Sequence, residues 1–216
     1  MKKTIIFALL VVAIVALFCA QACADRLITI PTGNTLAKAS VKAEAISGFS
    51  DGTTTLVPFG EVYRAYWVNV GLGNVEIEGT RYVERGGDHK DCFSAELGIL
   101  PETIITPAIG FGVRDIGNEI ERGVYLAVSK TLPLSDKIPM MPVRNIKVHG
   151  GYGIDGLNGI FLGAQADLPM HLTLSVEEVD SKFNASLAWN VIPKLSLKFY
   201  SLDGEFFYGA SFRAGL

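Results

Sequence analysis

Cysteine is scarce in this sequence, with three residues in 216 positions. Cys19 and Cys23 lie close to the N-terminus, so removal of a leader would leave Cys92 alone. A single cysteine can form neither an intramolecular disulfide nor a Cys-rich metal site. Stability must therefore come from packing and hydrogen bonding.

Histidine and positive charge are also sparse. The formal net charge is -3, and no basic block suggests a nucleic-acid partner. His89, His149 and His171 lack the H-x-x-x-H spacing of a helical metal site, so we expect no metal. Residues 151 to 156 match G-x-G-x-x-G, but they join two expected strands instead of a strand and a helix, so we expect no nucleotide or other cofactor.

Long hydrophobic runs are missing after Phe18. A hydrophobic run near the N-terminus, Ile5 to Phe18, follows Lys2 and Lys3. It is short for a permanent membrane helix. These features predict a signal peptide over residues 1–24, cleaved after Ala22-Cys23-Ala24, and a single domain over residues 25–216. The alternative is lipidation at Cys19 or Cys23, but Phe18 precedes Cys19, and Ala20-Gln21-Ala22 lacks the leucine usual three positions before a lipidated cysteine.

The rest of the chain alternates apolar and polar residues, as a half-buried strand does. Leu172, Leu174 and Val176 fall on one face of such a strand, whereas Thr173, Ser175 and Glu177 fall on the other. The same pattern predicts about twelve strands, near residues 37–47, 61–72, 75–84, 92–99, 104–113, 122–130, 145–153, 159–167, 172–177, 183–191, 195–200 and 206–216.

Turns of two chemical kinds separate these strands and alternate along the chain. One kind contains proline, as at Leu132-Pro133 and Leu168-Pro169, and the other is rich in Gly, Asp and Asn, as at Asp155-Gly156 and Asp203-Gly204. Alternate turns of a meander lie at opposite ends of its sheet. The sequence therefore predicts an all-β fold, an antiparallel up-and-down β-barrel of about twelve strands. A periplasmic β-sandwich is the alternative, because it also alternates polar and apolar faces.

Charged residues recur on the polar faces of the expected strands, where they would line the barrel lumen. In an open lumen they would set selectivity, and in a plugged one they would neutralise each other. The candidates are Glu76, Glu78, Glu96, Arg114, Lys147, His149, Glu177, Lys198 and Arg213. The aromatic residues Trp67, Trp189, Tyr63, Tyr66, Phe206 and Tyr208 are interpreted as an interfacial girdle or packing residues.

The stretch Pro107 to Lys130 resembles a segment of the YjbH-like envelope proteins. The positions that carry this resemblance are Pro107, Gly112, Arg114, Asp115, Ile116, Gly117, Tyr125, Leu126, Val128, Ser129 and Lys130. It implies an outer-membrane β-barrel connected with exopolysaccharide, and it brings no catalytic residue. From the residues alone, we expect Arg114 to reach Glu96 and Asp115 to start a turn by accepting backbone hydrogen bonds.

These observations predict a non-enzymatic barrel in the outer membrane of a Gram-negative-type bacterium. It would guide or anchor exopolysaccharide or pass small solutes. Its expected partners are outer-membrane lipid and polysaccharide or other envelope proteins. A soluble or lipid-anchored periplasmic polysaccharide-binding sandwich is the second hypothesis. A membrane-embedded lipid hydrolase or acyltransferase, with a Ser and His pair at the lipid boundary, is the third.

Overall fold

The computed structural model describes residues 26–49, 62–133, 143 and 145–215, and within them the chain forms twelve β-strands. They are β1 (Ser40–Gly48), β2 (Val62–Leu72), β3 (Val75–Glu84), β4 (His89–Leu100), β5 (Ala108–Arg114), β6 (Gly123–Pro133), β7 (Asn145–Asp155), β8 (Gly159–Leu168), β9 (Leu172–Val179), β10 (Lys182–Ile192), β11 (Leu195–Leu202) and β12 (Glu205–Gly215). No helix in these ranges is long and apolar enough to cross a membrane. The predicted signal peptide and cleavage site lie outside the described residues.

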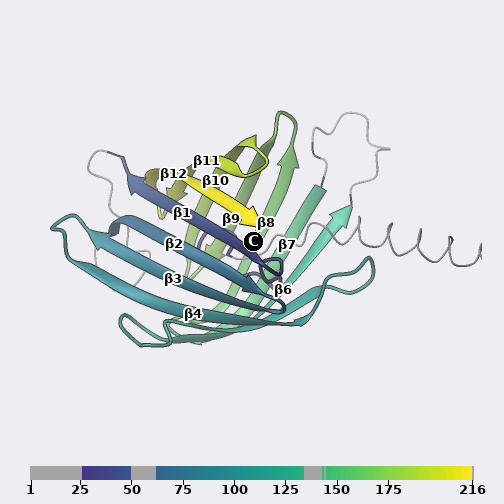
Figure 1. Ribbon diagram of the computed structural model, residues 1–216, viewed down its shortest axis with the longest axis horizontal. Helices are drawn as coiled ribbons and strands as arrows, with labels where there is room; N and C mark the ends of the chain where they lie inside the picture. The colour runs from purple at the N-terminus through teal and green to yellow at the C-terminus, as the bar shows by residue number, and fades with distance from the viewer. Residues whose placement is uncertain (1–25, 50–61, 134–142, 144, 216) are drawn as a thin grey trace, which may run out of the picture.

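Each strand pairs antiparallel with its neighbours in sequence, and β1 pairs with β12 to close the barrel (Figure 1). Closure leaves no free sheet edge, which distinguishes the fold from an open two-sheet sandwich. The predicted all-β up-and-down barrel is therefore confirmed over the described residues, including the number of strands.

Two predicted strands begin several residues too early. Residues 37–39 precede β1 instead of belonging to it, because they form an exposed turn in which Ala39 has a positive φ of 57°. Residues 104–107 form a loop before β5. In that loop the Thr103 backbone N–H donates to the Thr106 carbonyl at 3.0 Å, and Pro107 has no N–H to give to a ladder.

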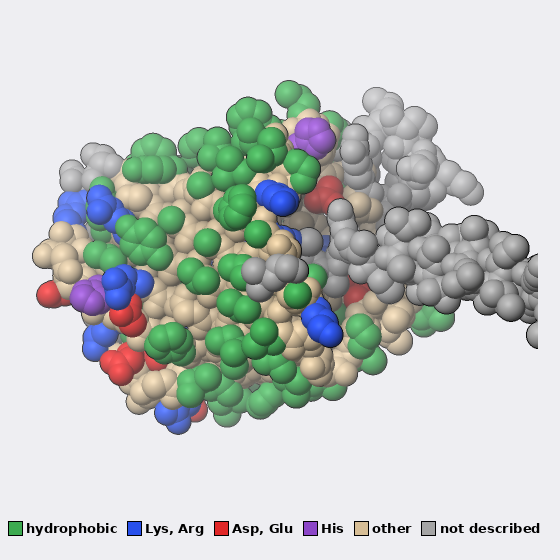
Figure 2. Space-filling view, in the orientation of Figure 1, with side chains coloured by type: hydrophobic (Ala, Val, Ile, Leu, Met, Phe, Trp, Pro, Cys, Tyr) green, Lys and Arg blue, Asp and Glu red, His purple; other side chains and the backbone are tan. Residues whose placement is uncertain are grey.

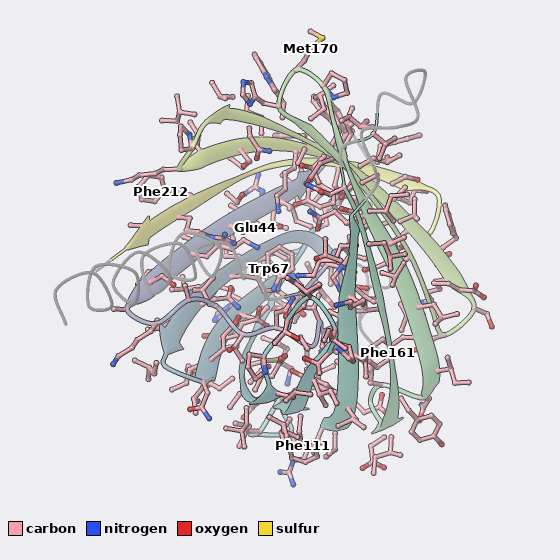
Figure 3. The ribbon with its side chains drawn as sticks, turned by 90° about the vertical axis from the view of Figure 1, so that its right-hand side faces the viewer. Glu44, Trp67, Phe111, Phe161, Met170 and Phe212 are labelled. Atoms are coloured by element: carbon pink, nitrogen blue, oxygen red, sulfur yellow. The ribbon has the colours of Figure 1, made fainter. Side chains whose placement is uncertain are left out.

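Large apolar side chains cover the outside of the barrel. Successive side chains of a strand point to opposite faces. In β6, Tyr125, Ala127 and Ser129 therefore point inward and Leu126 points outward. Hydrophobic side chains spread over the barrel wall, and charged ones gather at the end that carries the β3–β4 turn (Figure 2). Seen along the barrel, Glu44 and Trp67 lie inside the ring of strands and Phe111 and Phe212 outside it (Figure 3). Other outward side chains are Phe93, Leu97, Leu174, Leu187, Trp189, Phe199 and Tyr208.

The interior holds two apolar clusters as well as buried polar side chains. One cluster includes Ile46, Trp67 and Phe207, and the other includes Tyr125 and Phe161. Trp67 is therefore an interior packing residue, the second of the two interpretations given for the aromatic residues, and it does not belong to an interfacial girdle. The register places it opposite Glu44 and Thr80, both on inward positions.

Candidate functional site

The lumen is occupied by the chain's own segment Arg26–Ala39, which we call the plug segment. Its apolar side chains Ile28, Ile30 and Leu36 are buried inside the barrel, together with Thr32 and Asn34. Ile28 packs into the first interior cluster and Ile30 into the second. The segment turns on itself, since the Leu27 backbone N–H donates to the Ile30 carbonyl at 2.9 Å. The plug segment thus completes both apolar clusters of the interior.

One carboxylate on the barrel wall holds the tip of the plug segment. Glu177 on β9, 2% exposed, accepts backbone N–H donors from Ile28 at 2.9 Å, Thr29 at 2.8 Å and Ile30 at 3.3 Å. It also accepts the Thr29 hydroxyl and, at 3.0 Å, the amide of Asn184. Consecutive backbone N–H groups aimed at one anion form a nest, which replaces the water that a buried carboxylate loses.

The middle of the plug segment is held by two further side chains of the wall. The Gly33 backbone N–H donates to the Ser129 hydroxyl at 2.8 Å, and the Leu36 N–H donates to Glu76 at 2.6 Å. Gly33 lies so close to β5 and β6 that a methyl group on it would be 2.6 Å from the Ala108 carbonyl oxygen. Only glycine allows this approach.

Arg26 brings a positive charge to the acidic side of the lumen. Its guanidinium donates to Glu78, lies 3.8 Å from a Glu44 oxygen and stacks 3.9 Å over the Trp67 ring. Glu44 also binds Lys198 at 2.8 Å, Lys42 at 3.1 Å and the Tyr200 hydroxyl at 2.6 Å. We call this cluster the Glu44 centre. The acidic wall is thus neutralised in part by the wall itself and in part by the plug segment.

A small cavity lies between the plug segment and the barrel wall. A cavity of about 40 Å³ is lined by Arg26, Pro31, Asn69, Glu76, Glu78, Glu96, Arg114 and Tyr125, among others. That is room for a water molecule or two, not for a sugar ring. This cavity between the plug segment and the wall is therefore too small for a sugar.

All nine candidates for the lumen lie on inward positions of their strands. Glu76, Glu78 and Glu177 meet the plug segment directly, and Arg114 donates to the carbonyl of Thr29. Glu96 accepts the Tyr125 hydroxyl at 3.0 Å and lines the cavity with Arg114. The others lie apart from this group: Lys147 is 3.5 Å from Glu102, His149 contacts Ser129, Lys198 binds Glu44, and Arg213 lies opposite Lys42.

The residues that carry the YjbH-like resemblance hold turns and pack the interior. Asp115 accepts backbone N–H donors from Glu119, Ile120 and Glu121 at 2.7 to 3.0 Å, which confirms it as the start of a turn. Gly117 follows in that turn. The Tyr125 ring covers Gly112, where no side chain would fit.

Lys130, the last residue of that stretch, stabilises the β4–β5 loop. Its ammonium donates to the carbonyls of Thr103 at 2.6 Å, Ile104 at 2.9 Å and Thr106 at 3.3 Å. Ile104 and Ile105 at the tip are 96% and 88% exposed. This residue therefore shapes a loop outside the lumen.

Ser129 and His149 form a pair, 2.7 Å apart between Oγ and Nδ1. Ser129 is fully buried behind Gly33, and His149 Nε2 has no hydrogen-bond partner among the described residues. A hydrolytic pair needs access to substrate and a third group that orients the imidazole. The geometry favours a structural role, and it places the pair in the lumen instead of at the lipid boundary.

Sequence reasoning missed the plug segment and the Glu44 centre. The polar alternation of Lys42 and Glu44 in β1 could have revealed that centre. The plug segment offers less, because residues 27–33 show no strand alternation. Its hydrogen-bond partners on the barrel wall beyond β1 lie 32 to 155 positions away.

A closed antiparallel barrel with an apolar outside and a charged inside is the architecture of outer-membrane barrels. No protein-family model matches the sequence, and comparison with curated protein sequences finds no match either. Among solved structures, the KdgM porin in complex with disordered oligogalacturonate aligns with a TM-score of 0.50 at 9% identity, over 82% of this chain and 99% of that chain. The KdgM porin alone gives 0.49 at 10% identity over the same shares. The first alignment shows a shared barrel fold.

Proposed function

We propose that this protein is an integral barrel of a bacterial outer membrane whose lumen provides a route for small solutes. The observation that carries the proposal is the sidedness of the wall, with large apolar side chains outward and ionised ones inward on the same strands. An aqueous surface would favour the opposite distribution, because exposed apolar area of this extent lowers solubility. A bilayer core stabilises it.

Strand length agrees with a membrane location. The strands contain 7 to 12 residues, and a tilted strand crosses the hydrocarbon core in about 9 to 11. The charged end in Figure 2 would then lie in water at one side of the bilayer. The β1 start and the β12 end lie together at the opposite end, the one expected to face the periplasm.

Solute passage is favoured over catalysis because the interior groups face a lumen and the Ser129–His149 pair is buried. The KdgM fold adds support as a porin architecture. The YjbH-like resemblance suggests exopolysaccharide as the alternative cargo, or as a surface polymer that the barrel guides or anchors. Binding of the purified protein to exopolysaccharide from its host would distinguish this cargo from small solutes.

The test uses the full chain expressed in a Gram-negative host. Membranes are washed with urea, and the detergent-extracted protein is run on a gel with and without heating. We expect the protein to stay in the pellet and to change mobility on heating, as a closed barrel does when it unfolds. Release by urea together with solubility in plain buffer would contradict the proposal and favour a soluble periplasmic protein.

A further inference from the structure

The β4–β5 loop, residues 101–107, leaves two adjacent apolar side chains uncovered at the end of the barrel that is expected to face the periplasm. Ile104 and Ile105 are the most exposed large apolar side chains of the described residues. We propose that this loop is a lipid anchor: its two isoleucines enter the boundary between headgroups and acyl chains of the bilayer, while Lys130 keeps the loop backbone hydrogen-bonded. The inference rests on the proposed function, because it requires a barrel that spans a membrane.

The loop lies at the rim of the barrel, on the outer side of the wall. Strand β4 begins at the β3–β4 turn, where charged side chains gather, and ends at the opposite rim (Figure 1). Lys130 points outward, because its neighbour Ser129 points inward and its cross-strand partner Val148 is exposed on the outer face. The Lys130 ammonium binds the loop from that face. The tip of the loop is therefore held over the outside of the wall.

The one charged residue in the sequence of the loop is turned the other way. The Glu102 carboxylate accepts the Thr131 backbone N–H and lies 3.5 Å from the ammonium of Lys147, which occupies an inward position. The residues of the tip, Thr103 to Thr106, carry no charged side chain. The loop thus has the same sidedness as the strands, with its ionised group toward the lumen and its apolar groups away from it.

A loop that enters lipid has to satisfy its backbone polar groups within the protein, because the hydrocarbon offers no water to bind them. The Thr103 hydroxyl accepts the backbone N–H of Ile105 at 3.2 Å and of Thr106 at 2.9 Å, and the Thr103 N–H donates to the Thr106 carbonyl. Lys130 donates to the carbonyls of Thr103, Ile104 and Thr106. These groups are satisfied without water, so the isoleucines can leave water without exposing them to lipid unpaired.

The apolar surface of the tip continues the apolar outer surface of the wall. Ile99 and Leu100 at the end of β4 and Leu132 near the end of β6 are exposed at the same rim. A bilayer that covers the wall up to these residues reaches the loop. Because moving apolar side chains out of water is favourable, the isoleucines gain by joining that lipid. The surface therefore fits the bilayer that already surrounds the barrel.

The experiment measures the depth of a nitroxide spin label at the tip, in the full chain folded in phospholipid vesicles. The native cysteines Cys19, Cys23 and Cys92 are replaced by serine, and Ile104→Cys carries the label. Oxygen concentrates in hydrocarbon and a water-soluble nickel chelate stays outside, so the ratio of their collision rates with the label rises with depth. We expect this ratio to be several-fold higher at Ile104→Cys than at Lys194→Cys, which lies exposed in the β10–β11 turn of the same rim.

The role of Lys130 is tested in the same labelled protein. Lys130→Met keeps most of the aliphatic stem but removes the ammonium donor. The ratio at Ile104→Cys should then fall toward that at Lys194→Cys, because carbonyls left without a donor are drawn to water. Lys130→Arg, which keeps hydrogen-bond donors, should retain most of the depth. An unchanged ratio in Lys130→Met would refute the part of the proposal that concerns Lys130.

A third label, at Leu126→Cys on the outer face of β6, separates the lipid anchor from the proposed function. A low ratio at Leu126→Cys, together with loss of heat-dependent mobility in the unlabelled wild type, would refute the membrane barrel itself. A high ratio there with a low one at Ile104→Cys would refute the anchor alone. If the label at Ile104→Cys is shielded from both oxygen and nickel, protein covers the tip, and the lipid anchor is refuted as well.

Discussion

The Glu177 carboxylate accepts the backbone N–H of Thr29 at 2.8 Å across 148 positions of sequence. Both groups are withdrawn from bulk water inside the barrel, and each supplies what the other lost on burial. The neighbouring N–H groups of Ile28 and Ile30 join the same carboxylate. A charged side chain of β9 thus orders a segment that precedes β1.

Replacing Glu177 should loosen the tip of the plug segment. In Glu177→Ala, the N–H groups of Ile28, Thr29 and Ile30 lose their acceptor, and a buried unsatisfied donor costs about 1 to 3 kcal/mol. Hydrogen exchange of residues 26–31 should accelerate while the strands keep their protection. Glu178→Ala is the matched control, because Glu178 is the next residue and is exposed. Unchanged exchange at the tip would show that apolar packing alone holds it.

Because the outside of the barrel is apolar, the stability cost of introducing a charged side chain there should depend strongly on its position along the strand. Leu126 in β6 and Ile116 in the β5–β6 turn are 46% and 47% exposed. A difference between the two substitutions would therefore not come from different exposure of the original side chains. If the barrel spans a bilayer, Leu126→Arg near the middle of a strand should destabilise it in lipid by about 2 to 4 kcal/mol, and Ile116→Arg by about 0 to 1. Urea unfolding in lipid vesicles measures the difference. Equal effects would contradict a membrane-spanning wall.

The barrel could be predicted from the sequence because the patterns that specify it are local. Alternation with a period of two assigns faces to β9, β10 and β12, and the alternation of turn chemistry assigns ends. The occupant of the lumen follows no such rule. The backbone of the plug segment binds Glu177, Ser129 and Glu76 through groups that every residue type carries, so the side chains of that segment do not reveal the partners. The inward face of each candidate was predictable, whereas its partner was not.

The role of Lys130 could not be predicted from the sequence either. The YjbH-like resemblance singles out this residue but does not indicate what its side chain contacts. The structure gives it three loop carbonyls, those of Thr103, Ile104 and Thr106. Lys130→Ala should therefore raise hydrogen exchange and protease cleavage within residues 101–107 and leave the lumen unaffected. Lys194→Ala, in the β10–β11 turn, serves as the control. An altered exchange of the plug segment in Lys130→Ala would contradict a purely local role.

Two adjacent glycines in β7 should respond differently to a methyl group. Gly151 faces inward, where the Phe161 ring and the Leu126 carbonyl leave no room for one. Gly150 faces outward, where the nearest atom is a flexible Leu162 methyl at 3.1 Å. Gly151→Ala should cost about 1 to 3 kcal/mol through overpacking. Gly150→Ala should be close to neutral in the same unfolding experiment, and equal costs would show that the Phe161 ring moves aside freely.

Acidification should weaken the loop end of the barrel through Glu102, which lies outside the strands. Partial burial by itself raises the pKa of this carboxyl, but hydrogen bonds from Thr131 and the charge of Lys147 outweigh it and hold the pKa below its ordinary value of 4.5. A carboxyl whose pKa is lowered by folding contributes stability above the unfolded value, and this contribution is lost as the pH falls through the folded value.

The pH dependence can be isolated with Glu102→Gln, which cannot ionise. Above pH 4.5 the wild-type protein should be more stable than the variant, and the difference should shrink as the pH falls below 4.5. Urea unfolding at several pH values measures both proteins, with Glu205→Gln at the exposed start of β12 as the control. A difference that stays constant down to the lowest pH would mean that Glu102 acts through the shape of its side chain, since only an ionised partner of Lys147 and Thr131 makes the difference depend on pH.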